Sequence, residues 1–185
     1  MRPGRALKAK RANRGTVTLE EFAKAKGFTT EQLKEFKVSE IRKHKGFDTR
    51  VYFGNEGPEG AQRRGRQRLK LKNSDPGPDS KIIWAGNEAE LPMAPYGEWL
   101  LPQMQSNKGD WHKDMGLTIT EGEPDCLPLW ATKVPAIGIP GASFVKSVLG
   151  SNPENPPYQF FEGWEAINIC CDPDEAGEGF VSRVI

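Results

Sequence analysis

Carboxylates stand directly after two apolar segments of the chain, where a folded sheet could bring them together. Glu121 follows the segment 117–120, and Asp172 and Asp174 follow the segment 165–171. Both segments predict β-strands, and in an open parallel sheet ligands bind beyond the carboxyl ends of the strands. If the two strands are neighbours, these three carboxylates converge on one site.

Converging carboxylates need a counter-charge, because like charges about 4 Å apart repel one another. A divalent cation supplies that charge, and oxygen-only ligands suit Mg²⁺ or Mn²⁺, which keep several waters and bind phosphates. Gly122 and Gly177 let a ligand approach the backbone closely. A simpler interpretation stays open for Asp174, because an acid at this position is often the cap of the following helix.

The elements that position these acids form an α/β pattern. Residues 116–185 alternate strand, helix, strand, loop, strand and helix, which predicts a parallel sheet. Strands are expected at 117–120, 135–139 and 165–171, with helices at 125–130 and 179–185.

Residues 16–104 predict a smaller α+β subdomain. Thr18 and Glu21 form a capping box at the start of a helix that Gly27 ends, and a second helix begins near Thr29. Strands are expected at 49–53, 66–72 and 81–84, where β-branched, aromatic or alternating residues occur. A flexible basic arm is expected before this subdomain, at residues 1–15, and a linker is expected after it, at residues 105–115.

Composition excludes several classes of protein. The 185 residues carry 26 Lys and Arg against 25 Asp and Glu, so the net charge is +1, but basic and acidic residues gather in separate segments. Three cysteines cannot build a disulfide framework, and without paired Cys-x-x-Cys halves no zinc site is expected. No apolar run is long enough for a membrane span, and no secretory signal is present, so a cytoplasmic protein of a bacterial or phage-infected cell is expected.

Three motifs resemble the signatures of the TOPRIM domain, in the version found in bacterial DNA primases and in phage and plasmid primase–helicases. They are ITEGEPD at 119–125, AIGIPGA at 136–142 and ICCDPDEAG at 169–177. The resemblance implies that Glu121, Asp172 and Asp174 are catalytic ligands of Mg²⁺ or Mn²⁺. It also implies that Asp125, Gly122 and Gly177 support these ligands from outside the metal's own shell.

The upstream half resembles, more loosely, the N-terminal subdomain of the primase core, whose basic residues face the template and the incoming nucleotide. The positions carried over are Arg64, Arg66, Arg68, Lys70 and Lys72. The implied function is template-directed RNA primer synthesis by two-metal nucleotidyl transfer in phage-type or plasmid-type DNA replication. The implied partners are single-stranded DNA, nucleoside triphosphates and a replicative helicase.

Two departures from the family leave alternatives open. The zinc ribbon of replicative primases is absent, and the chain stops one helix after the second acidic motif, so an incomplete TOPRIM domain is expected. A TOPRIM nuclease remains one alternative, because the same metal site serves strand cleavage. The other is a non-catalytic primase remnant that binds single-stranded DNA or a helicase.

Overall fold

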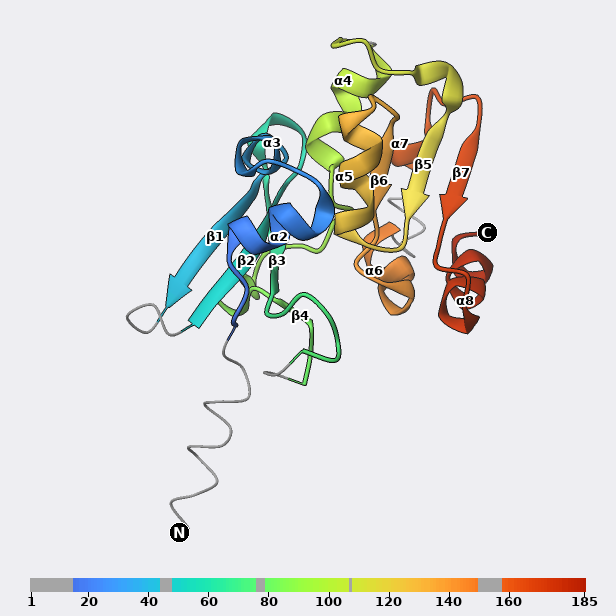
Figure 1. Cartoon of the computed structure of the whole chain (residues 1–185). Helices are drawn as coiled ribbons and strands as arrows, with labels where there is room; N and C mark the ends of the chain where they lie inside the picture. Colours follow the sequence, from blue (N-terminus) through green and yellow to red (C-terminus); the bar gives the residue numbers. More distant parts are fainter. Residues whose placement is uncertain (1–14, 44–47, 76–78, 107, 150–157) are drawn as a thin grey trace. The chain divides into compact units, whose positions relative to one another are not determined.

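The computed structural model describes residues 15–43, 48–75, 79–106, 108–149 and 158–185 (Figure 1). The predicted basic arm at 1–15 therefore lies outside the described residues, except for Gly15. The chain forms two compact units. The first comprises residues up to Gly54 and Arg64–Glu90, and the second comprises Asn55–Arg63 and Leu91–Ile185.

A four-stranded sheet with the order β1-β2-β3-β4 dominates the first unit. Its strands are β1 (Val38–Lys43), β2 (Asp48–Glu56), β3 (Gln62–Arg68) and β4 (Ile82–Trp84). The β1–β2 and β3–β4 pairs are antiparallel. Helix α2 (Leu19–Lys26) packs on this sheet through Phe22, whose ring meets Phe53 of β2 edge-on with centroids 5.6 Å apart. Both side chains are almost fully buried, so this contact lies in the core of the unit.

The predicted helix caps are confirmed. The Thr18 side chain accepts a hydrogen bond from the Glu21 amide, and the Thr18 amide donates one to the Glu21 carboxylate. Gly27 ends α2 with φ of 75°. A second capping box, Thr29 with Gln32, starts α3 (Thr30–Glu35).

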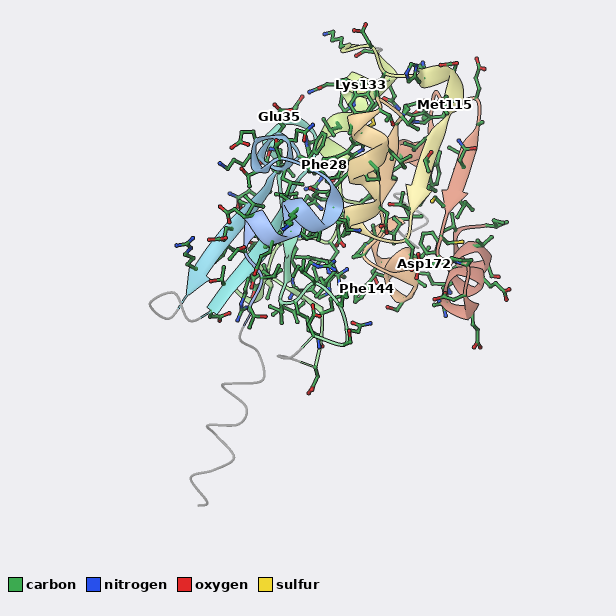
Figure 2. The ribbon with its side chains drawn as sticks, in the orientation of Figure 1. Phe28, Glu35, Met115, Lys133, Phe144 and Asp172 are labelled. Atoms are coloured by element: carbon green, nitrogen blue, oxygen red, sulfur yellow. The ribbon has the colours of Figure 1, made fainter. Side chains whose placement is uncertain are left out.

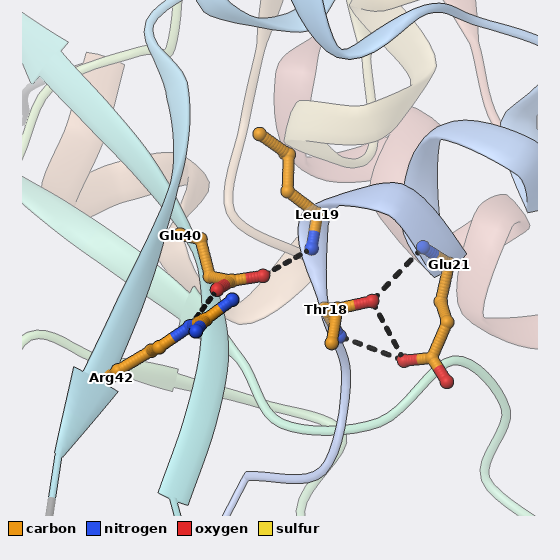
Figure 3. A network of polar contacts seen from close by, with 5 residues as sticks. All are labelled: Thr18, Leu19, Glu21, Glu40 and Arg42. Atoms are coloured by element: carbon orange, nitrogen blue, oxygen red, sulfur yellow. Dashed lines mark hydrogen bonds and ion pairs between the residues drawn. The ribbon is translucent and has the colours of Figure 1, made fainter. Parts of the chain in front are cut away.

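Strand β1, which the sequence analysis did not predict, holds α2 in place. Glu40 accepts a hydrogen bond from the Leu19 amide at 2.9 Å and pairs with Arg42 two residues along the strand (Figure 3). Residues at alternate positions of a strand share one face, so Glu40 and Arg42 lie on the same face of β1 and form their ion pair there.

The predicted parallel sheet organises the second unit, and its strand order is β6-β5-β7. Its strands are β5 (Leu117–Thr120), β6 (Ala136–Gly138) and β7 (Ile167–Cys170). Helix α5 (Glu123–Ala131) packs against β5 and β6, and α8 (Glu175–Val184) follows β7 (Figure 1). The described residues also form the helices α4 (Leu101–Gln105), α6 (Val145–Leu149) and α7 (Tyr158–Phe161). Among the described residues, 3-10 helices are formed by Pro58–Gly60, Gly86–Glu88, Glu98–Leu100, Lys113–Met115 and Ala142–Phe144.

An aromatic cluster closes the β6 side of this sheet. The rings of Tyr96, Trp99 and Trp130 lie 5.1–5.7 Å apart, and Trp130 Nε1 donates to the Ala136 carbonyl at 2.9 Å. Tyr96 also exchanges two backbone hydrogen bonds of 2.8 Å with Gly138, which covers the outer edge of β6. Strand β7 forms the other edge of the sheet.

Residues 105–115, predicted as a linker, belong to the second unit. Trp111 is buried there, with Lys133 Nζ 5.3 Å from the centre of its ring. None of the helices formed by the described residues has the length and apolar character that a membrane crossing requires.

Candidate active site at the ends of two parallel strands

The predicted adjacency of the two acid-bearing strands is confirmed. Strand β5 pairs with β7 in parallel, with Thr120 opposite Cys170, and the Glu121 amide donates to the Cys170 carbonyl at 3.2 Å. The two strands therefore end at the same, carboxyl-terminal edge of the sheet, and Asp172 follows β7 just before α8 (Figure 2). Glu121 and Asp172 consequently emerge side by side.

The Glu121 carboxylate carries the clearest electrostatic signal at this edge. Its Oε2 atom is buried and has no hydrogen-bond partner in the described part of the chain. Burial raises the pKa of Glu121, a hydrogen bond from the Asp172 backbone opposes this, and the charges of Asp172, Asp174 and Asp125 raise the pKa further. The charges of all three predicted acidic partners therefore contribute to the pKa of Glu121.

Asp174 has an observed structural role. One of its carboxylate oxygens accepts a hydrogen bond from the Gly177 amide at 2.9 Å, which makes it the N-cap of α8. The capping interpretation left open for Asp174 therefore describes this contact. Its predicted role at a metal concerns the same side chain, which is exposed, and stays a prediction.

The described residues do not include a preassembled metal site, because no three His, Cys, Asp or Glu side chains gather closely enough to hold an ion. The donor set nevertheless fits a hard divalent cation, since it offers carboxylate oxygens, one of them buried without a partner. Mutual repulsion among the carboxylates also raises the pKa of Glu121. An ion bound here would have to draw exposed Asp172 and Asp174 toward Glu121.

A cavity of about 250 Å³ opens beside these acids. It is lined by Glu121, Asp125, Pro128, Leu129, Cys170, Cys171 and Asp172. The three acids were predicted from the sequence as site residues, and the other four residues were not. A signal existed for two of them, because Asp125, Pro128 and Leu129 stand at positions i, i+3 and i+4 of α5 and so share one face of the helix. The cavity therefore has a polar wall and an apolar wall.

Gly177 fixes the loop that carries the aspartates. A methyl group at this position would overlap the backbone oxygen of Asp172 and press on Cys171. We expect Gly177→Ala to lower the free energy of unfolding by about 1–3 kcal/mol, because the site is already packed against backbone. Urea denaturation measures this change.

A matched control lies two residues further along the same helix. Gly179 has only the mobile end of Arg183 near its hypothetical methyl group, at 3.6 Å. Gly179→Ala should therefore stabilise the protein by up to about 1 kcal/mol, the usual gain from replacing glycine in a helix. Equal effects of the two substitutions would contradict the tight contact between Gly177 and the Asp172 loop.

The raised pKa of Glu121 predicts how stability responds to pH. Folding favours the protonated acid, so its contribution is complete below the ordinary pKa of 4.5 and is lost as the pH rises through the higher pKa of the folded state. Glu121→Gln should therefore melt at a higher temperature than wild type at pH 7, in the presence of a chelator. The difference should disappear near pH 4. A Glu121→Gln variant that melts at a lower temperature than wild type at pH 7 would contradict the raised pKa of Glu121.

The predicted basic residues separate into two groups within the first unit. Arg64 and Arg66 of β3 are half-buried, and Lys72 is exposed. Arg68 and Lys70 are each only 6% exposed. Arg68 donates to the Leu71 carbonyl, and Lys70 Nζ donates to the Asn73 carbonyl at 2.9 Å, so both hold the loop after β3. The observed contacts of Arg68 and Lys70 are structural, and their contact with nucleic acid stays a prediction.

Comparison with known proteins relates the fold to phage primases. The primase fragment of the bacteriophage T7 primase-helicase matches the whole chain with a TM-score of 0.60 and 20% identity. A structure of the T7 lagging-strand DNA polymerase with primase domains of two gp4 subunits, bound to an RNA/DNA hybrid and dTTP, matches 87% of the chain, with a TM-score of 0.59 and 23% identity. No protein-family model and no curated protein matches the sequence.

These similarities show the fold. The chain is a mixed α/β protein whose parallel and antiparallel sheets resemble those of the T7 primase fragment. It spans 66% of the length of that fragment and 70% of the second chain. At 20–23% identity, these similarities do not establish the activity of the chain.

Proposed function

We propose that this chain is the catalytic core of a DNA primase, with a TOPRIM domain in its second unit that joins ribonucleotides on a DNA template. One observation carries the proposal: Glu121 and the Asp172–Asp174 motif follow neighbouring parallel strands and leave the sheet at one edge. The likeness to a T7 primase fragment supports it. The nucleotide-transfer site would then stand where ligands bind in parallel sheets.

Glu121, Asp172 and Asp174 would hold Mg²⁺ or Mn²⁺ at this edge. When bound, such ions neutralise charge on the triphosphate and activate the attacking hydroxyl for in-line displacement. The 3′ oxygen of the primer would form a bond to the α-phosphorus, and the bond to pyrophosphate would break. The unpartnered Oε2 of Glu121 is suited to contact the ion or to accept the hydroxyl proton.

The cavity residues would position the nucleotide. Asp125 would orient Glu121 or a water molecule from the first turn of α5. Pro128 and Leu129 offer the apolar wall of the cavity to the nucleotide. Gly122 leaves room for Asp125, because a methyl group there would approach the Asp125 carboxylate to 2.9 Å.

The first unit would bind the single-stranded template through its basic residues. Arg64, Arg66 and Lys72 carry charges that are at least partly accessible. Their contacts with phosphates would make binding strongly dependent on salt. A replicative helicase remains a proposed partner.

One incubation separates this proposal from its alternatives. The protein is mixed with single-stranded DNA, labelled nucleoside triphosphates and either Mg²⁺ or Mn²⁺, with a chelator control. Labelled RNA products of defined length support a primase. Shortened DNA without labelled products indicates a nuclease, and DNA binding without either product indicates a non-catalytic remnant.

A further inference from the structure

Two arginines of the first unit share the ring of a single tryptophan. In the antiparallel pair β3–β4, Arg66 stands directly opposite Trp84, and Arg64 lies two residues before Arg66 on the same face of the strand. The guanidinium carbons of Arg64 and Arg66 each lie 5.2 Å from the centre of the Trp84 ring. Both distances are within the range of a cation–π contact.

This arrangement places two like charges on one aromatic ring. Because both guanidinium groups contact the same ring, the two cations are close enough to repel each other, and an anion beside them would relieve this repulsion. No acid lies within ion-pair distance of Arg64 among the described residues, and its buried Nε atom has no hydrogen-bond partner there. The Arg64 charge is thus available to an anionic ligand.

The next two basic residues differ from this pair. Arg68 and Lys70 are buried and donate to loop carbonyls, whereas Arg64, Arg66 and Trp84 are half-buried. A guanidinium held against a ring by a cation–π contact still has N–H groups that can bind phosphate oxygens in a bidentate manner. Trp84 therefore limits the freedom of two phosphate-binding groups before a ligand arrives.

We propose that Trp84 is a positioning residue that holds Arg64 and Arg66 as a paired site for the phosphodiester backbone of single-stranded DNA. The inference rests on the proposed function, because it assumes that this face binds the template. It assigns to Trp84 contacts with guanidinium groups and not with bases. Binding through this pair should therefore be independent of base sequence.

Salt-dependent binding measurements test the role of Trp84. Wild type and Trp84→Leu are titrated with a fluorescent single-stranded oligonucleotide at several salt concentrations. The same titrations use an abasic strand of equal length. We expect Trp84→Leu to weaken binding about fivefold on both strands. Its salt slope should shift toward that of the double variant Arg64→Gln/Arg66→Gln, which should lose about 1.4 from the magnitude of the slope.

Three further variants make the result specific. Trp84→Phe keeps an aromatic face and should restore most of the affinity. Trp84→Leu added to the double arginine variant should cause no further loss, because the two changes act on one interaction. Lys34→Gln removes an exposed charge from α3 and should leave the affinity within twofold of wild type. Thermal melting confirms that each variant is folded.

Distinct results overturn the two proposals. A loss confined to the base-bearing strand, with an unchanged salt slope, would show that Trp84 stacks on bases and would refute the positioning role alone. Wild-type affinity in Trp84→Leu would also refute that role alone. If wild type fails to bind single-stranded DNA at all, both the positioning role and the proposed primase function fall.

Discussion

Asp172→Asn is expected to reduce metal-dependent nucleotide incorporation by at least about 100-fold, because even residues that act on a metal through its ligands contribute 10- to 100-fold. The substitution removes one charge and keeps the shape of the side chain. Asp172 is exposed, and its charge raises the pKa of Glu121, so stability should stay the same or rise slightly. Primer extension with labelled nucleotides measures activity, and thermal melting measures stability.

Asp174 requires a different pair of variants because its side chain also caps α8. Asparagine is as good an N-cap as aspartate, whereas alanine loses about 1 kcal/mol of helix stability. Asp174→Asn should therefore abolish metal-dependent activity without loss of stability, and Asp174→Ala should lose both. Full activity in Asp172→Asn and Asp174→Asn together would refute the assignment of this edge as the metal site.

Much of the fold follows from local sequence signals. Two helices could be predicted from the polar residues that start them, at Thr18 and Thr29. Two strands could be predicted from the apolar runs before Glu121 and Asp172. All four signals depend only on residues that are neighbours in the sequence. Strand β1 was not predicted, since its polar residues are stabilised by a helix distant in sequence.

The predicted strand at 66–72 is partly wrong for a related reason. Strand β3 covers Gln62–Arg68 and ends there, although the alternation of basic and apolar residues continues to Lys72. Arg68, the last residue of β3, and Lys70 just beyond it donate hydrogen bonds to carbonyls of the following loop. Long basic side chains can serve either solvent or backbone, and the alternation alone does not distinguish these roles.

The candidate site could also be predicted only in part from the sequence, because some of its contacts depend on the tertiary structure. The pairing of β5 with β7 follows from two strand-end acids and a parallel sheet, whereas the capping contact of Asp174 depends on where α8 begins. Strand β7 reads as an apolar run, yet Ile167 is 40% exposed because the strand lies at the edge of the sheet. Position within the sheet, and not hydrophobicity, sets that exposure.

A buried ion pair in the first unit should give the largest effect on stability. Asp48, which is 1% exposed, accepts hydrogen bonds from Arg50 Nε at 2.7 Å and Nη2 at 2.6 Å, and from the Gly15 amide at 2.6 Å. Arg50 also donates to Gln67 at 2.7 Å. Asp48→Ala leaves the Arg50 charge buried without this partner, so we expect the free energy of unfolding to fall by about 3–5 kcal/mol. Urea denaturation followed by circular dichroism measures the loss.

A second ion pair in the same sheet, in which the arginine is exposed, provides the matched control. Arg42 and Glu40 are also two residues apart on one strand, but the Arg42 side chain is 68% exposed. Arg42→Gln should lower stability much less than Asp48→Ala, because water screens the exposed Arg42 charge and the remaining Glu40 carboxylate still accepts the hydrogen bond from the Leu19 amide. Replacing Asp48 and Arg50 together by Leu and Met should cost less than Asp48→Ala alone, because no uncompensated charge remains. If the double replacement costs more than the single one, the penalty comes from lost hydrogen bonds to Gly15 and Gln67 and not from the stranded charge.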